Sequence, residues 1–522
     1  MDTADKLTAP PATKVGGAYA WYALGVMVVV YVLNFIDRQI LSILAEDIKA
    51  DLSLNDTQLG YLYGTAFALF YALFGIPLGR LADSWYRGKL MSIGLAIWSA
   101  MTFASGLAGS FTQLALFRVG VGVGEAAASP AAFSMLADYF QRQRRALAMS
   151  IYSAGLYLGM GLSLPIGGWL SSSWDRAYAQ GGAPFGLVGW QAAFIAVGSP
   201  GLLVAAWIWT LREPLRGASE GQPSAIVRPG AWRSFALELA AILPPLTLWS
   251  VSRFPGALRT NLVALALVAT GTGGLIGLTG DTAQWVSYGV GIYAVFSWIQ
   301  MLRFTDRPTY QLIWGTPMVV LAIFGFGSLS FFTYSFSFWA APFAIRTFGI
   351  SKQTVGLTIG IPGAFASAAG VIVGGRLSDA WKNRDARGRI FVCMLAVILP
   401  APFFAIMFST ASFTAYCILS ACVYFLNSMW VGSTVAAYQD FVLPRMRGTV
   451  GATYLLGATM VGLALGPYFT GKVATLSGSL RLGAYSLYLV APITLFLLWK
   501  VSRHTQELEA TKYARARAVG EI

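Results

Sequence analysis

Two stretches of this chain share a spaced set of residues, and each lies at the end of a long apolar segment. The first, GIPLGRLADSWYR, covers residues 75–87, and the second, GGRLSDAWKNR, covers residues 374–384. Glycine, arginine, leucine, aspartate and tryptophan stand at positions 79, 80, 81, 83 and 85, and again at 375, 376, 377, 379 and 381. Because the offset between the copies is constant, we expect the chain to fold as two similar halves.

Two further sets of residues keep step between the halves. One set consists of glycines, Gly60 and Gly64 in the first half and Gly356 and Gly360 in the second. The other set places an aspartate seven residues before an arginine, as Asp138 with Arg145 and Asp440 with Arg447. The duplication therefore extends well beyond the first motif.

The composition indicates a membrane protein. Of the 522 residues, 56% are hydrophobic and only 11% are charged, whereas soluble domains carry about 25% charged residues. The apolar runs do not alternate with polar residues as the strands of a membrane barrel do. We therefore predict an all-α membrane protein.

Fourteen segments are long and apolar enough to cross a membrane as helices. They form groups of six, two and six, at 19–42, 58–80, 90–110, 113–137, 146–171 and 190–211, then 260–279 and 284–302, then 314–345, 354–375, 389–409, 411–438, 448–471 and 481–500. Two parallel six-helix bundles with an extra two-helix hairpin between them are the predicted architecture.

Lys and Arg are concentrated in alternate loops, which marks those loops as cytoplasmic. This divides the chain into a cytoplasmic tail at 1–18, a six-helix bundle at 19–211, a linker region at 212–310, a second bundle at 311–500 and a basic cytoplasmic tail at 501–522. Within the linker region, the apolar stretch FALELAAILPPLTLW is short and holds two prolines, which predicts an interfacial helix. We expect the extra hairpin to have a packing or linking role. Both termini are predicted to be cytoplasmic, in a bacterial inner membrane.

Several functions are disfavoured by the residue types present. The net charge of +14 resides mostly in short loops between apolar runs, so we expect no nucleic-acid partner. The only histidine is His504, and the three cysteines lie in apolar runs without zinc spacing. The chain has no P-loop or HExxH motif. We therefore predict no enzymatic activity, no metal and no cofactor.

These motifs resemble those of a known transporter family. GRLADSWYRGK after the second span and the two D-x6-R pairs resemble the cytoplasmic signatures of the major facilitator superfamily. NFIDRQILSIL, RVGVGVGEAAASPAAFSMLADYF and LGYLYGTAFALFYALFGIPLGRLAD resemble the Spinster subfamily. The resemblance implies a major facilitator fold and transport of lysophospholipid or sphingosine-type lipids, in several members linked to proton gradients.

The repeated motifs predict a cytoplasmic gate. Carboxylates at helix ends can pair with basic residues, and pairs that form only when the cytoplasmic face is closed would favour one of two states. The gate residues predicted from the motifs are Gly79, Asp83, Arg87, Lys89, Asp138, Arg145, Asp379, Arg384, Asp440 and Arg447.

Four ionisable residues lie inside the predicted spans of the first half. Asp37 and Arg38 are in the first span, and Arg118 and Glu125 are in the fourth, seven residues apart and so on one helix face. Such groups are costly in a membrane and normally face a polar cavity. We expect Glu125 or Asp37 to carry a coupled proton, and Arg118 or Arg38 to bind an anionic headgroup. Glycines at 120, 122 and 124 are expected to leave an open wall beside them.

The second half offers no acid or base in the middle of its cavity spans. Its predicted substrate contacts are aromatic or amide side chains, namely Phe332, Tyr334, Trp339, Asn427 and Trp430. A charged wall facing an aromatic wall suits an amphipathic molecule with a polar head and an apolar tail.

The predicted function is secondary active transport by alternating access, with protons linked to movement of an amphipathic lipid such as a lysophospholipid. The glycine-rich fifth span around Pro165 resembles an antiporter signature, with Leu164 where that signature has glycine. The alternatives are a proton-coupled carrier of a small organic anion, sugar or drug, and a non-transporting receptor on the same fold. The expected partners are the substrate, protons and membrane lipids, and we expect a monomer.

Overall fold

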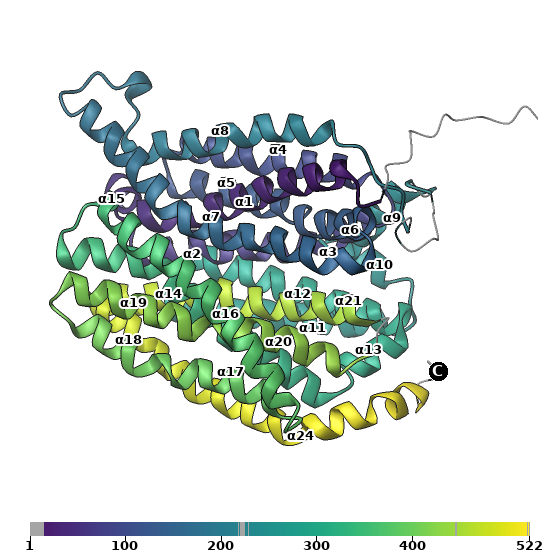
Figure 1. The fold of residues 1–522 in the computed structure, drawn as a ribbon. Helices are drawn as coiled ribbons and strands as arrows, with labels where there is room; N and C mark the ends of the chain where they lie inside the picture. Colours follow the sequence, from purple (N-terminus) through teal and green to yellow (C-terminus); the bar gives the residue numbers. More distant parts are fainter. Residues whose placement is uncertain are drawn as a thin grey trace, which may run out of the picture.

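The computed structural model describes residues 15–217, 219, 225–227, 229–443, 446–518 and 520, and within these the side chains of residues 142 and 146 are left aside. Most of the predicted tail at 1–18, residues 220–224 of the predicted linker region and the last residues of the second tail lie outside this description. The described residues form helices joined by short connections, with no β-strand among them (Figure 1).

The first half contains six membrane-length units. They are α1 (Ala18–Asp51), α2 (Asp56–Tyr63) followed by α3 (Thr65–Ala82), α4 (Arg87–Ser105), α5 (Phe111–Glu125) followed by α6 (Ala128–Tyr139), α7 (Arg142–Ala177) and α8 (Gly189–Trp209). The glycine at position 64 separates α2 from α3, and the residues Ala126 and Ala127 separate α5 from α6.

The second half repeats this arrangement. It comprises α14 (Pro317–Phe348), α15 (Lys352–Val355), α16 (Ile361–Lys382), α17 (Gly388–Ile398), α18 (Pro400–Ser409), α19 (Phe413–Ser428), α20 (Trp430–Asp440), α21 (Arg447–Gly457), α22 (Gly466–Ser477), α23 (Leu480–Tyr485) and α24 (Val490–Ala518). Wider π-helical turns at Gly356–Gly360 and Ala458–Ala464 join α15 to α16 and α21 to α22. The predicted basic tail is therefore helical through Ala518, because α24 continues past the span.

The region between the halves is also helical. It contains α9 (Ala231–Ile242) and α10 (Leu246–Val251), separated by Pro244 and Pro245, then α11 (Ala257–Thr279), α12 (Thr282–Thr305) and α13 (Arg307–Ile313). The α12 helix packs against α3, and Gln284 at its start accepts a hydrogen bond from Thr65 of α2–α3 at 2.7 Å. Asp281 before it pairs with Lys472 of α22 at 2.7 Å. The hairpin is therefore attached to both halves.

Thirteen helical units of the described chain are long and apolar enough to cross a membrane. They match thirteen of the fourteen predicted spans. The remaining one, α4, is a helix of 19 residues that packs against α5 and α8 inside the first half. The predicted all-α membrane fold is confirmed.

The bundle has two ends that differ in how the halves meet. We call the end that holds the start of α1 and the end of α24 the terminal end, and the opposite one, where α7 leads to α8, the far end (Figure 1). The core of the first half continues into residues such as Phe338 and Leu463 of the second half. The terminal part of the second half, with Phe326 and Phe441, has a separate core. Packing between the halves is therefore concentrated toward the far end.

The repeated glycines lie at this contact between the halves. Gly60 of α2 and Gly64 directly after it lie against the backbone of Pro467 and Leu463. A methyl group on Gly64 would stand 2.5 Å from the Leu463 carbonyl oxygen. The equivalent Gly356 lies against α7, where a methyl group would stand 2.7 Å from the Leu164 carbonyl oxygen. The duplicated glycines therefore allow the two halves to approach by their backbones.

Candidate functional site

The four ionisable residues predicted from the spans form one buried cluster between α1 and α5. Arg38 donates to Glu125, with 2.7 Å between Nη2 and Oε2. Arg118 Nη1 lies 3.4 Å from the backbone carbonyl oxygen of Asp37. All four side chains are less than a tenth exposed. The cluster therefore contains two cations and two carboxyl groups in an apolar bundle.

Aromatic rings enclose the Arg38 guanidinium. Its carbon lies 4.9 Å from the ring centre of Phe35, 4.5 Å from that of Phe67 and 5.0 Å from that of Tyr71. Cations over ring faces are stabilised by the ring quadrupole. Arg38 is therefore held by one carboxylate and three rings, of which Phe67 and Tyr71 share a face of α3.

The glycines of α5 serve close packing instead of leaving an open wall, so that prediction was wrong. A methyl group on Gly122 would stand 2.5 Å from the Phe67 carbonyl oxygen, and one on Gly124 would stand 2.7 Å from the Gly94 carbonyl oxygen. These glycines allow α3 and α4 to approach α5. That approach brings Phe67 and the polar residues of α4 to the charge cluster.

One of the predicted residues of the second half lies near this cluster. Tyr334 of α14 is an electrostatic neighbour of Arg38. Asn427 and Trp430 both donate to Thr333 Oγ1, at 2.9 and 3.2 Å. Thr333 was not predicted, although a hydroxyl next to Tyr334 in an apolar span was a usable signal. The hydroxyl group of Thr333 on α14 thus accepts hydrogen bonds from two predicted substrate contacts, Asn427 and Trp430.

The other two predicted residues of the second half belong to its own packing. Phe332 lies against Phe404, with 5.0 Å between ring centres. Trp339 is buried and donates to the Pro467 carbonyl oxygen at 3.0 Å. Trp339 therefore fixes α14 against α22, and we leave it out of the substrate contacts proposed below.

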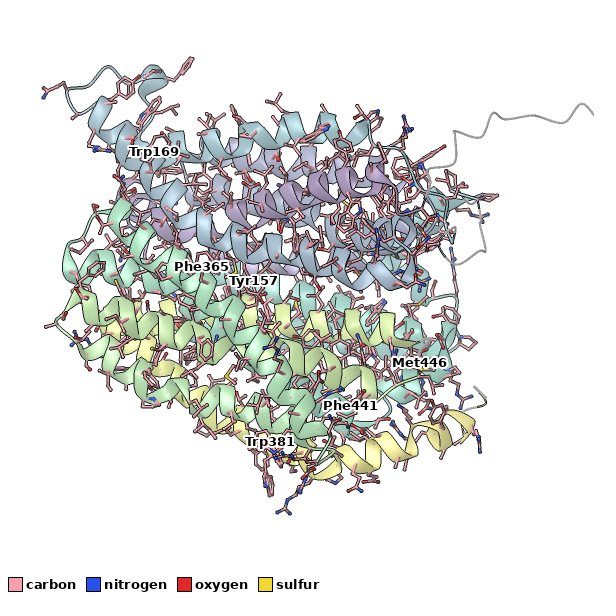
Figure 2. All side chains as sticks on the ribbon, viewed as in Figure 1. Tyr157, Trp169, Phe365, Trp381, Phe441 and Met446 are labelled. Carbon is pink, nitrogen blue, oxygen red and sulfur yellow. The ribbon has the colours of Figure 1, made fainter. Side chains whose placement is uncertain are left out.

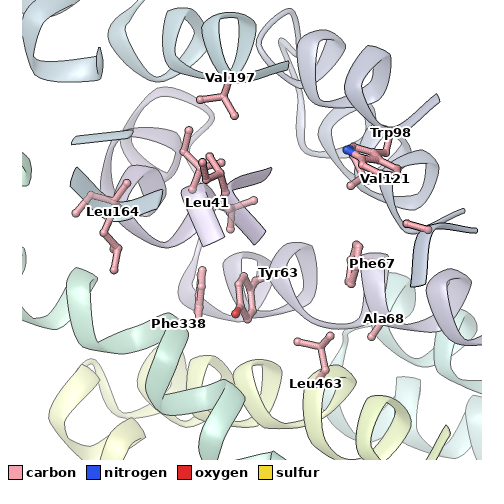
Figure 3. Packing of buried hydrophobic residues seen from close by; sticks show 14 of the residues in the cluster. Leu41, Tyr63, Phe67, Ala68, Trp98, Val121, Leu164, Val197, Phe338 and Leu463 are labelled. Atoms are coloured by element: carbon pink, nitrogen blue, oxygen red, sulfur yellow. The ribbon is translucent and has the colours of Figure 1, made fainter. Parts of the chain in front are cut away.

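A polar and aromatic layer follows the charge cluster toward the far end. Gln39, next to Arg38 in sequence, donates to Ser337 Oγ at 2.7 Å and accepts a hydrogen bond from Tyr63. The rings of Tyr63 and Phe338 are stacked with centres 4.4 Å apart, and Figure 3 shows them side by side. This layer joins the two halves directly beside the charge cluster.

Ion pairs between the halves complete the far end. Arg346 of α14 pairs with Glu46 of α1 at 2.7 Å and with Asp56 of α2 at 2.9 Å. Lys352 of α15 pairs with Asp47 of α1 at 2.5 Å. This network was not predicted, and its residues lie near helix ends next to loops with few basic residues.

The repeated motifs of the terminal end form one cluster in each half. In the first half, Arg87 is fully buried, pairs with Asp138, and lies 2.7 Å from Glu213 Oε1. In the second half, Arg389 pairs with Asp440. Arg87–Asp138 and Arg389–Asp440 each join residues of a single half, and Glu213 lies in the region directly after the first half. In this conformation, none of these ion pairs connects the first half to the second half.

The structure corrects one assignment in these clusters. Arg389, not the predicted Arg384, occupies the position equivalent to Arg87, and both arginines stand 51 residues before their aspartates. Arg384 and Arg447 are exposed. Lys89 lies over the ring of Tyr86 at 4.5 Å and outside the Arg87 cluster. Arg389 follows Asp379 by ten positions, whereas Arg87 follows Asp83 by only four, and this difference hides the equivalence in a simple motif comparison.

The remaining predicted gate residues lie around these clusters. Arg145 donates to Ser219 Oγ at 3.0 Å, and Asp379 lies 3.6 Å from Arg389. A methyl group on Gly79 would stand 3.9 Å from Cβ of Pro130, which is an ordinary contact distance. Asp83 is close enough to Arg216 to interact with it electrostatically. The Arg216 guanidinium donates to the Ala82 carbonyl oxygen at 2.7 Å.

An apolar crevice lies on the seam between the halves. It has a volume of about 320 Å³ and is lined by residues of α7 and α16, including Tyr157, Leu158, Ala364 and Phe365. Figure 2 shows Tyr157 and Phe365 adjacent at this seam. The lining is almost wholly apolar, and Phe365 is 71% exposed. A crevice of this kind can hold a hydrocarbon chain.

Two similar six-helix halves, the first of which holds a buried charge cluster, are the architecture of a multi-pass helical transporter. The family model of the Major Facilitator Superfamily matches residues 27–467. The chain therefore belongs to the Major Facilitator Superfamily, and the predicted family and fold are confirmed.

Individual relatives are similar over nearly the whole chain. An MFS-type efflux pump of Mycolicibacterium smegmatis is 27% identical over 93% of this chain and 92% of its own length. A probable L-galactonate transporter of Escherichia coli is 23% identical over 86% and 82%. A solved bacterial homologue of the human lysosomal transporter Spinster, inward-facing and unoccupied, is 25% identical, covers 96% and 97%, and has a TM-score of 0.65. The resemblance to Spinster transporters is thereby supported over both halves.

Proposed function

We propose that this protein is a proton-linked transporter of an amphipathic lipid with an anionic headgroup, such as a lysophospholipid. The observation that carries the proposal is the buried Arg38–Glu125 pair enclosed by rings. A second arginine, Arg118, lies beside it, and an apolar crevice lies at the seam between the halves. Arginines suit phosphate, and the crevice suits an acyl chain.

The proposed coupling uses competition for the arginine. A phosphate or carboxylate headgroup that reaches Arg38 competes with Glu125 for the guanidinium. A carboxylate that loses its cation in an apolar site favours the protonated form. Substrate binding and proton binding are then linked through one side chain, with Asp37 as the second carboxyl group available to a proton.

The second half would contact the middle of the substrate molecule. Tyr334 lies on the Arg38 side of α14, and Asn427 and Trp430 meet at Thr333. We propose that this wall contacts the region between head and tail. A charged first half and an aromatic second half then orient the molecule.

The conformation fits one state of an alternating-access cycle. The far end is joined across the halves by ion pairs and by the Tyr63–Phe338 layer. We propose that the terminal end is cytoplasmic, that the protein is a monomer in a bacterial inner membrane, and that the conformation is inward-facing. We further propose that the clusters around Arg87 and Arg389 hold the helix ends of each half together as the halves move.

The test is flux in vesicles with an imposed pH step. Lysophospholipid, a glucuronate-type anion and a lipophilic cation are offered separately to wild type and to Glu125→Gln and Asp37→Asn. We expect lysophospholipid flux that depends on the pH step and is lost in at least one variant. Full proton-dependent flux in both variants would contradict the coupling mechanism.

The second candidate is a carrier of a small organic anion. It is favoured by the two buried arginines and by the similarity to a probable L-galactonate transporter. Movement of the glucuronate-type anion without any lysophospholipid flux would establish this alternative and reject the lipid proposal.

A further inference from the structure

The α4 helix presents two polar side chains to the charge cluster that the proposed mechanism does not use. Trp98 and Thr102 are four residues apart and so share one helix face. Both are fully buried. Figure 3 shows Trp98 beside Val121 of α5, inside the first half and away from the second. A buried indole and hydroxyl need hydrogen-bond partners.

Several polar atoms without partners converge at this place. They are Oδ1 of Asp37, Nε1 of Trp98, Oγ1 of Thr102, and Nε and Nη2 of Arg118. The side chains of Trp98 and Thr102 lie near the Asp37 carboxyl group, and none of these atoms has a hydrogen-bond partner among the described residues in this conformation. The charged groups that face Asp37 are Glu125 and Arg118 of α5. The neighbouring Arg38 is bound to Glu125.

We propose that Trp98 and Thr102 are positioning residues that set the proton affinity of Asp37. An indole N–H can only donate, whereas a threonine hydroxyl can donate or accept. Ionised Asp37 can therefore receive hydrogen bonds from both side chains. Protonated Asp37 can donate its own proton to Thr102 Oγ1 while Trp98 still donates to its carbonyl oxygen. The two side chains can thus form hydrogen bonds with Asp37 in both protonation states, and they stabilise the ionised state more strongly.

The arrangement separates the two carboxyl groups by environment. Glu125 pairs with Arg38, whose guanidinium is surrounded by the aromatic side chains of Phe35, Phe67 and Tyr71. Asp37 forms no ion pair among the described residues and is faced by α4 instead. The inference rests on the proposed function in one respect only, namely that the proton of Asp37 is used in transport.

The chain provides a closely matched control on the same helix. Ser99, one residue after Trp98, is also buried and also lacks a hydrogen-bond partner. Its hydroxyl points toward Gly201 of α8, because a methyl group on Gly201 would overlap Ser99 Oγ. Ser99→Ala therefore removes a buried hydroxyl of the same helix without affecting the surroundings of Asp37.

The experiment is a pH titration of the carboxyl infrared band of the full purified chain in lipid nanodiscs. The Asp37 band is assigned by its loss in Asp37→Asn. Thr102→Val removes a donor and keeps similar volume, and Trp98→Phe removes the indole N–H and keeps an aromatic ring. We expect each to move the midpoint of the band upward by about one pH unit, the effect of losing a hydrogen bond to a charged group. Thr102→Ser and Ser99→Ala should keep the wild-type midpoint.

Two results would overturn the inference. One is a wild-type midpoint and band position in both Thr102→Val and Trp98→Phe. The other is the lack of any Asp37 transition between about pH 4 and pH 10. Failure of the proposed function is recognised separately, because wild-type flux that ignores a pH step leaves the infrared titration fully interpretable.

Discussion

Arg38 shows how a single residue links stability to function. The Arg38 side chain is 7% exposed and pairs with the fully buried carboxylate of Glu125. Removing one member of a buried ion pair leaves an uncompensated charge, which costs about 3–5 kcal/mol. Replacing both members by apolar or neutral groups avoids that cost. Stability measurements can therefore detect the pair without a known substrate.

Glu125→Gln is expected to lower stability by about 3–5 kcal/mol, because Arg38 then lacks its counter-charge. The double variant Arg38→Met with Glu125→Gln should recover most of this loss. Thermal unfolding of the detergent-solubilised protein measures both. Equal destabilisation in the single and double variants would show that the two side chains are not energetically coupled.

The two equivalent arginines of the terminal end provide an internal comparison. Arg87 is fully buried with two carboxylate partners, whereas the Arg389 side chain is 17% exposed. Arg87→Met is therefore expected to cost about 3–5 kcal/mol, and Arg389→Met about 1 kcal/mol. Unfolding temperatures of the two variants check this order. A larger loss for Arg389→Met would contradict the structural argument from burial.

At the scale of elements, the duplicated glycines control how closely helices of different halves approach. Gly60 and Gly64 place the end of α2 against the backbone at the start of α22 and in the turn before it, and Gly356 places the turn before α16 against α7. The residues they contact include Pro165 and Pro467, which also occupy equivalent positions in the repeat. The same contact is thus made twice, once on each side of the bundle.

Gly356→Ala is expected to shift the protein away from the closed far end. Its new methyl group would meet the Leu164 backbone, and such overpacking costs about 1–3 kcal/mol. A conformational equilibrium changes roughly 5- to 150-fold for that energy. Distances between spin labels at the far ends of α1 and α14 should lengthen. Gly271→Ala, where a methyl group meets nothing within 4 Å, is the control and should keep the wild-type distances.

At the scale of the whole molecule, the far end is closed by partly exposed ion pairs. The side chains of Arg346 and Lys352 are 29% and 15% exposed. Pairs with this exposure contribute about 0.2–1 kcal/mol each and are weakened by salt. Several weak pairs across one seam can close a transporter without trapping it in that state.

Arg346→Gln combined with Lys352→Gln is expected to open the far end in a larger fraction of molecules. Raising the salt concentration should likewise increase the fraction of wild-type molecules whose far end is open, and it should increase that fraction less in the double variant. Labelling of cysteines introduced at the far end measures both, in a background without the three native cysteines. Unchanged labelling in the variant would show that packing alone closes the far end.

Much of this protein was predictable from its sequence. Apolar runs predict spans because burial in a membrane depends on local composition, and the repeat predicts two halves. Asp37, Arg38, Arg118 and Glu125 were recognisable because an ionisable residue in a span is costly. Arg389 was overlooked because it stands six positions farther from its motif aspartate, Asp379, than Arg87 stands from Asp83.

The tertiary structure alone decided how these residues are paired. Arg38 binds Glu125, Arg118 lies near the Asp37 backbone, and α4 brings Trp98 and Thr102 to the same place. Such pairings depend on the rotation and spacing of helices that are distant in sequence. The sequence by itself determined the class of protein and its membrane-spanning units, because hydropathy and repetition are local properties. Which carboxyl group faces which cation was decided only by packing, because close contacts between helices are set by the shapes of side chains from several segments together.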